Sequence, residues 1–149
     1  ITRSGEDIEY SIRGHKAGFK IGLIPEAKVY HKRRTDFLQF YKQVHFFGRA
    51  RINIYKFFPN ELKLVHFFPS VFTLGLIFTL LANLLGWPIA KVGNFVVAVI
   101  ILLIFFHSWS KNKSAKIAFL SIATSFIQLT GYGLGFMQDF WKRVIFKQS

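Results

Sequence analysis

The sequence predicts a mostly α-helical membrane protein. A partial α/β segment with one helix and short strands comes first, followed by an amphipathic interfacial helix and two to three transmembrane helices. Charged side chains are concentrated in residues 1–63, whereas Lys91 is the one Asp, Glu, Lys or Arg between Leu64 and Ser110. A charge-poor stretch of that length is typical of membrane spans and not of a soluble domain. We therefore divide the chain into residues 1–34, 35–63 and 64–149.

Residues 1–34 predict a helix followed by two short strands. Ser4 is a candidate N-cap, and acidic residues follow it where the helix dipole favours negative charge. Gly18 suits the left-handed position that closes a helix. Two extended pieces follow at residues 20–24 and 28–31, with a bend at the proline between them.

Residues 35–58 predict an amphipathic helix that ends before Pro59. Basic residues and a histidine form its polar stripe, and the opposite face carries Phe37, Phe40, Tyr41, Val44, Phe47 and Gly48. Aromatic residues below a basic stripe, immediately before a membrane span, suit the lipid interface. The alternative is a helix packed on the protein's own core.

Three apolar segments are predicted to be membrane helices, at about residues 65–86, 92–109 and 117–137. The third contains more polar and small residues than the others. Ser121/Ser125 and Gly131/Gly135 are pairs of small residues four apart, a spacing that lets helices approach closely in lipid. We expect a third span packed against the other two. The alternative is a re-entrant or interfacial segment broken near Gly131.

The formal net charge of +13 comes from basic residues that flank the apolar segments. This distribution favours a membrane surface over nucleic acid, for which the sequence has no recognition motif. The positive-inside rule places residues 1–63 and 110–116 in the cytoplasm. The basic tail at Lys142, Arg143 and Lys147 does not fit three crossings. Either the third segment does not cross, or the tail is an exception.

Glu6 and Asp7 are the first candidates for chemistry. Ser4-Gly5-Glu6-Asp7 fits a capping box, in which the carboxylate of Asp7 reaches back to the N-cap. The functional alternative makes Asp7 a general base that removes a proton from an acceptor hydroxyl. The pair alone leaves both interpretations open.

The order and spacing of three sequence motifs favour the general-base interpretation of Asp7 over the capping box. They are Gly-Glu-Asp-Ile-Glu-Tyr-Ser-Ile-Arg from Gly5, Lys-Ala-Gly-Phe-Lys-Ile from Lys16, and Ile-Pro-Glu-Ala-Lys-Val-Tyr-His ending at His31. Together they resemble the C-terminal part of the GT-A catalytic domain of family 2 glycosyltransferases. The resemblance covers residues 4 to about 52, and implies a partial GT-A α/β remnant. It implies that Asp7 is the catalytic base of an inverting transfer and that Glu6 shapes the acceptor site.

By the same resemblance, His31 matches a histidine that completes a divalent-metal site in some related enzymes. A neutral imidazole with carboxylates and phosphates suits Mn²⁺ or Mg²⁺. The principal ligands would be aspartates of a D-x-D motif, which this sequence lacks, so we expect them upstream. The alternative is a histidine that ends a strand with a surface hydrogen bond.

Gln43, Arg49 and Arg51 loosely resemble a Gln-x-x-Arg-Trp motif of processive family members, although the Trp is absent. The resemblance implies contacts with donor phosphate and acceptor, and arginine suits a diphosphate because its planar donors fork onto phosphate oxygens. The alternative is that these basic residues lie against anionic lipid headgroups.

The resemblance implies the C-terminal part of an inverting glycosyltransferase. Such an enzyme moves a sugar from a nucleotide-sugar donor to a lipid-linked or glycan acceptor at the cytoplasmic face of a bacterial inner membrane, in cell-envelope or exopolysaccharide synthesis. We expect the chain alone to be inactive, because the donor-binding half would lie upstream. A second hypothesis is a non-catalytic membrane-anchoring or assembly module with a basic cytoplasmic arm. It explains the spans and the charge, but not the order of the motifs.

Overall fold

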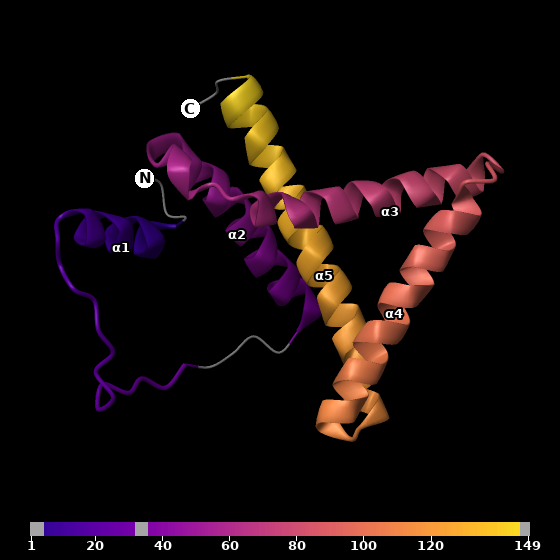
Figure 1. Ribbon diagram of the computed structural model, residues 1–149, viewed down its shortest axis with the longest axis horizontal. Coiled ribbons are helices and arrows are strands. Elements are labelled where there is room, and N and C mark those ends of the chain that lie inside the picture. Colours follow the sequence, from indigo (N-terminus) through magenta and orange to yellow (C-terminus); the bar gives the residue numbers. More distant parts are fainter. Residues whose placement is uncertain (1–4, 32–35, 147–149) are drawn as a thin grey trace.

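The described part of the protein is mostly helical, as predicted. In the computed structural model the described residues are 5–31 and 36–146. Five α-helices follow one another in Figure 1: α1 (Glu6–Lys16), α2 (Phe37–Phe57), α3 (Phe68–Leu84), α4 (Ala90–Asn112) and α5 (Ala115–Asp139). Three shorter helical turns accompany them: η1 (Pro59–Glu61), η2 (Leu64–Phe67), and the π-helical η3 (Phe140–Ile145), which continues α5.

The two predicted short strands are absent from the residues that the structure describes. Residues 20–24 and 28–31 are irregular backbone, and Leu23 and Val29 within them are each 90% exposed. A strand needs a neighbouring strand to complete its backbone hydrogen bonds, and an isolated extended segment is not stable alone. No such neighbour lies within residues 5–31 and 36–146. The prediction of strands is therefore wrong here, and the α/β remnant is not shown.

Glycines mark both ends of α1. Gly5 is the N-cap, with φ of 84° and no side-chain capping hydrogen bond, while Ser4, the predicted N-cap, lies outside the described residues. At the other end Gly18 takes φ of 80°. Its amide donates to the His15 carbonyl at 3.1 Å, and the next amide donates to the Gly14 carbonyl at 3.0 Å, as in a Schellman motif. The predicted role of Gly18 is confirmed.

Helix α2 packs along the C-terminal half of α5 (Figure 1). It starts after Asp36, whose carboxylate accepts a hydrogen bond from the Gln39 amide at 2.9 Å, and it ends before Pro59 as predicted. Its buried residues are Val44, Gly48, Ala50, Ile52, Asn53 and Ile54. Phe37 and Phe47, expected on one apolar face with Val44, are 46% and 49% exposed. One side of α2 is thus packed on the protein's own core, the alternative that the sequence left open.

Helices α3, α4 and α5 form a triangle (Figure 1). Polar contacts join each pair of helices: Asn83–Asn94 between α3 and α4 at 3.0 Å, Ser108–Ser121 between α4 and α5 at 2.8 Å, and Ser70 Oγ to the Gly133 carbonyl between α3 and α5 at 3.3 Å. Helices α3 and α4 diverge with distance from their connecting turn, and α5 spans the gap between their far ends.

Three helical segments are long and apolar enough to cross a membrane, which indicates a membrane protein. They are Leu64–Leu84, Ala90–Asn112 and Ala115–Ile145, with 21, 23 and 31 residues. The predicted segments 92–109 and 117–137 lie within these helices, whereas 65–86 extends two residues beyond the end of the first one. Helix α5 runs unbroken through Gly131, so the structure does not have the break considered there.

Glycines allow α2, α5 and α3 to approach one another closely. A Cβ added to Gly135 would collide with the backbone of His45 on α2, and one added to Gly48 with the backbone of Tyr132 on α5. Gly133 faces the opposite way, against Pro69 at the start of α3. The close approach predicted for these small residues is confirmed, but Gly131 and Gly135 pack against α2 and not against another apolar span.

Substituting Gly135 by Ala is expected to destabilise the protein by about 1–3 kcal/mol, because the added methyl has no space without a backbone shift. The matched control is Gly75→Ala in α3, where a Cβ would have nothing within 4 Å. Alanine should leave that helix unchanged or slightly more stable. Thermal unfolding of both variants in detergent micelles provides the comparison, and equal midpoints would contradict the packing described above.

Candidate functional site

Glu6 and Asp7 lie in a pocket between the start of α1 and the side of α2. The pocket has a volume of about 460 Å³, and its other walls are formed by Gly5, Ile8, Phe46, Phe47, Ala50, Arg51 and Tyr132. Three separate helices, α1, α2 and α5, contribute to this acidic pocket. The structure therefore brings three of the predicted site residues together: Glu6, Asp7 and Arg51.

The start of α1 is held closely against α2 at this point. A Cβ on Gly5 would lie 2.9 Å from Cδ1 of the buried Ile54 side chain, and the positive φ of Gly5 also disfavours other residues. At the other end of α1, Lys16 Nζ lies 4.6 Å from the centre of the Phe58 ring, a cation–π distance. These two contacts position the first turn of α1, with its two carboxylates, over α2.

The geometry of α1 does not support the capping-box interpretation of Asp7. With Gly5 as N-cap, Asp7 is the second residue of the helix and not the third, the position from which a capping box reaches back. Ser11 Oγ donates to the main-chain carbonyl of Asp7 at 2.9 Å, a contact that does not use the carboxylate. Glu9, the other acidic residue of this turn, forms an ion pair with Arg13 at 2.6 Å.

The acidic pocket combines groups suited to a sugar acceptor. A carboxylate can accept a proton from a hydroxyl, and a guanidinium can bind phosphate oxygens in pairs. Phe46, Phe47 and Tyr132 add aromatic walls to the same space. Tyr132 was missed by the sequence argument, because nothing in the Gly-Tyr-Gly run indicates that α5 returns to the first helix.

Arg49, the second predicted phosphate-binding arginine, has a different partner. Its Nε donates to Oδ1 of Asp139 at 2.9 Å, and Arg143 Nε donates to Oδ2 of the same carboxylate at 3.0 Å. Asp139 is 1% exposed. A carboxylate buried this deeply needs such partners, and this one connects α2 to the end of α5. The structure thus gives Arg49 an ion-pairing position outside the acidic pocket.

The sequence argument did not single out Asp139. It is the one acidic residue after Glu61, and Arg143 follows it at a spacing of four. An isolated carboxylate at the end of an apolar helix, with a basic residue one turn later, is a signal that could have found it.

His45 lies beside this cluster, and burial lowers its pKa below the ordinary value of 6.5. The Arg49 guanidinium lowers the pKa further, while Asp139 and a hydrogen bond with the Gln138 side chain oppose the shift. Because the folded pKa lies below the unfolded one, the unfolded state binds more protons as the pH falls through 6.5.

We therefore expect the melting temperature of the protein in detergent to fall on acidification below pH 6.5 and to level off above it. His45→Gln should reduce this slope, because one of the groups that take up a proton on unfolding is gone. His15→Gln on exposed α1 is the control and should retain the wild-type slope. An unchanged slope in His45→Gln would show that His45 does not produce the effect.

Gln43 lines a neighbouring hollow of about 490 Å³ on α2. Its other lining residues are Gln39, Lys42, Phe46 and Phe47. Phe46 and Phe47 thus border both this hollow and the acidic pocket. Gln43 lies next to the acidic pocket, not within it.

His31, the predicted metal ligand, is exposed in the irregular segment after α1 and does not line the acidic pocket. Within residues 5–31 and 36–146, no group of three or more His, Asp or Glu is arranged to hold a metal ion. The described residues therefore do not form a Mn²⁺ or Mg²⁺ site by themselves.

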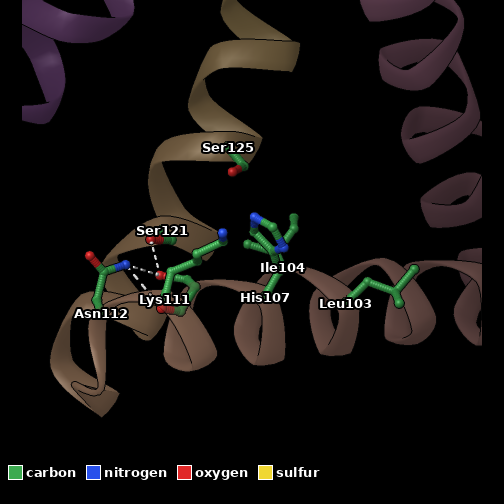
Figure 2. Close-up of a pocket in the computed structure, with 8 residues that line it drawn as sticks. Leu103, Ile104, His107, Lys111, Asn112, Ser121 and Ser125 are labelled. Carbon is green, nitrogen blue, oxygen red and sulfur yellow. Dashed lines mark hydrogen bonds between the residues drawn. The ribbon is translucent and has the colours of Figure 1, made fainter.

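A second, larger pocket of about 710 Å³ lies where α4 meets α5. Figure 2 shows His107 and Lys111 from α4 on one side of it, with Ser121 and Ser125 from α5 on the other. Asn112 Nδ2 donates to the Ser108 carbonyl at 2.9 Å, so part of this polar lining is bonded internally. Its lining contains no carboxylate, the kind of base that the resemblance implies, although His107 lines it.

Comparison with known proteins finds no matching family model, no similar curated protein and no similar solved structure.

Proposed function

We propose that this chain is the acceptor-side, membrane-anchored part of an inverting glycosyltransferase. Together with its donor-binding half, this enzyme transfers a sugar from a nucleotide-sugar to a hydroxyl of a lipid-linked or glycan acceptor at the cytoplasmic face of a bacterial inner membrane. The observation that carries the proposal is the acidic pocket, in which Glu6, Asp7 and Arg51 come together from α1 and α2. The sequence resemblance implies a catalytic base at Asp7 and an acceptor-site role for Glu6. A second, looser resemblance implies phosphate binding by Arg51, together with Gln43 and Arg49, which lie outside this pocket.

In this mechanism Asp7 is the general base. Its carboxylate takes the proton from the acceptor hydroxyl while that oxygen bonds to the anomeric carbon of the donor sugar. The bond between this carbon and the donor diphosphate breaks, and the nucleoside diphosphate leaves with the bonding electrons. Glu6 shapes the acceptor site, and Arg51 holds the phosphate groups of the lipid-linked acceptor.

The segment between α1 and α2 has the exposed apolar side chains of a surface that binds another protein domain. Its apolar side chains are exposed on irregular backbone, among them Phe19, Ile21, Leu23, Ile24, Val29 and Tyr30. Uncovered apolar groups on this scale are typical of an interaction surface. We assign this surface to the donor-binding half of the same enzyme. The principal ligands of a Mn²⁺ or Mg²⁺ ion, which would neutralise the leaving diphosphate, also belong to that half, with His31 as the candidate ligand from this chain.

The test is sugar transfer by the longer protein that includes a donor-binding half. A panel of nucleotide-sugars is incubated with a polyprenyl-diphosphate-linked sugar, and nucleoside diphosphate release and the anomeric configuration of the product are measured. We expect one donor to react with inversion. Residues 1–149 alone should transfer nothing. Transfer by the isolated chain, or retention of configuration, would contradict the proposal.

A membrane-anchoring or assembly module is the second candidate. The Arg49–Asp139–Arg143 cluster favours it, because one predicted phosphate ligand has a structural ion pair there. The reading frame upstream of Ile1 separates the two candidates. A β/α nucleotide-binding region ending in D-x-D supports the transferase, and a start codon directly before Ile1 supports the anchor.

A further inference from the structure

Both halves of α5 contact the same end of the α3–α4 hairpin. Near its start, the Ser121 hydroxyl lies 2.8 Å from that of Ser108, in the last turns of α4. Twelve residues later, the Gly133 carbonyl accepts a hydrogen bond from Ser70 Oγ at 3.3 Å, in the first turn of α3. The start of α3 and the end of α4 are the two ends of the hairpin farthest from its connecting turn (Figure 1).

A hairpin that crosses a membrane twice returns to the side on which it began. The paired amides of Asn83 and Asn94 mark its turn, so Ser70 and Ser108 both lie toward the opposite, open end. The part of α5 between its two contacts rises about 18 Å, at about 1.5 Å per residue. A hydrocarbon core of about 30 Å is too thick for this part of α5 to cross. Helix α5 therefore bridges two points on one side.

The contacts of α2 with the C-terminal half of α5 also indicate that this half lies at the membrane surface. Gly135 packs against the backbone of His45, and the carboxylate of Asp139 binds Arg49 at 2.9 Å. On its other faces α2 carries the exposed Lys42 and Lys56. These two exposed lysines, with Arg49 and Arg51 between them on the same helix, argue against placing α2 in the hydrocarbon core, because burying such charges in lipid is costly. The part of α5 that α2 covers must then also lie at the membrane surface.

The charges at the two ends of α5 agree with this placement. Basic residues precede or begin the helix at Lys111, Lys113 and Lys116, and others follow it at Lys142 and Arg143. If both ends lie on one side, all five satisfy the positive-inside rule, whereas three crossings would place the last two on the opposite side. Both groups also suit anionic lipid headgroups.

We propose that α5 does not cross the membrane but lies along its cytoplasmic surface, so that only the α3–α4 hairpin crosses. The partner of its exposed face is the lipid interface, with apolar side chains at both ends of the helix region: Ile117, Phe119, Leu120, Trp141 and Ile145. The residues that follow α5 lie on the same side as α2. This arrangement does not depend on the catalytic proposal.

Single-cysteine labelling tests the proposal cleanly, because the chain has no cysteine of its own. Lys20→Cys, Lys91→Cys and Lys142→Cys each place one thiol at an exposed position, before α2, in the first turn of α4 and after α5. Each variant of the full chain is treated with a membrane-impermeant maleimide in sealed vesicles of known orientation. We expect Lys20→Cys and Lys142→Cys to react from one side and Lys91→Cys from the other. Reaction of Lys142→Cys from the side on which Lys91→Cys reacts would overturn the proposal.

Two further cysteine positions report separately on the start of α5 and on the residues after it. Lys116→Cys, at the start of α5, should react from the same side as Lys20→Cys, and reaction from the opposite side would show that the hairpin does not return. Phe146→Cys is a second exposed reporter beyond α5. If neither Lys142→Cys nor Phe146→Cys reacts from either side of intact vesicles, the C-terminal residues are not at the surface and the proposal fails.

Discussion

Replacing Asp7 by Asn in the longer, donor-binding protein is expected to slow sugar transfer by about 10²–10⁴-fold, the usual contribution of a positioned general base. The amide keeps the size of the side chain but cannot take the proton from the acceptor hydroxyl. Because the donor is held elsewhere, its binding should stay nearly intact. Rates of nucleoside diphosphate release at saturating donor, with donor binding measured separately, give the two readouts.

Glu9→Gln is the matched control for this change. It removes a carboxylate from the same turn of α1, but that carboxylate pairs with Arg13 at 2.6 Å and does not line the acidic pocket. We expect this variant to retain transfer. Equal rates for Asp7→Asn and the wild type would remove Asp7 from the mechanism, and equal losses in both variants would indicate damage to α1 instead.

Asp139→Ala is expected to cost about 3 kcal/mol of stability, toward the lower end of what breaking a buried ion pair costs. It leaves two arginines without their shared carboxylate, although the Arg49 side chain is 40% exposed and can regain some water. The ion pairs that join α2 to the end of α5 would be lost. The measurement is thermal unfolding in detergent, with the helical circular dichroism signal as the probe.

Asp36→Ala provides the comparison for Asp139→Ala. It also removes a carboxylate near α2, but there it caps an exposed helix end through the Gln39 amide. Loss of such a cap costs about 1 kcal/mol. If the two variants unfold at the same temperature, the ion pairs of Asp139 contribute no more than a surface cap.

The helices were predictable because their signals are local. Gly18 and Pro59 mark helix ends through their own backbone preferences, and the apolar segments follow from composition alone. The prediction of strands at residues 20–24 and 28–31 failed, because a strand depends on a neighbouring strand that the local sequence does not reveal. The apolar face of α2 was only partly correct. Helical spacing cannot tell a face that meets lipid from one that meets α5.

The acidic pocket was predictable only in part. Of the six residues predicted from the motifs, the structure brings Glu6, Asp7 and Arg51 to one pocket and leaves the other three outside it. The Asp139 cluster depends on α5 returning to α2, a contact between residues far apart in the sequence. Nothing around Arg49 alone distinguishes a phosphate ligand from one half of an ion pair.

Protection of the acidic pocket by its acceptor tests the central claim most directly. Phe47→Cys places a thiol in the wall of the pocket, and Phe57→Cys places one at the end of α2, outside that wall, at similar exposure: 49% and 53% for the two native side chains. The rate of maleimide labelling is measured with and without a polyprenyl-diphosphate-linked sugar. We expect the acceptor to slow labelling of Phe47→Cys several-fold and to leave Phe57→Cys unchanged. Equal labelling rates of Phe47→Cys with and without the acceptor would contradict an acceptor site between α1 and α2.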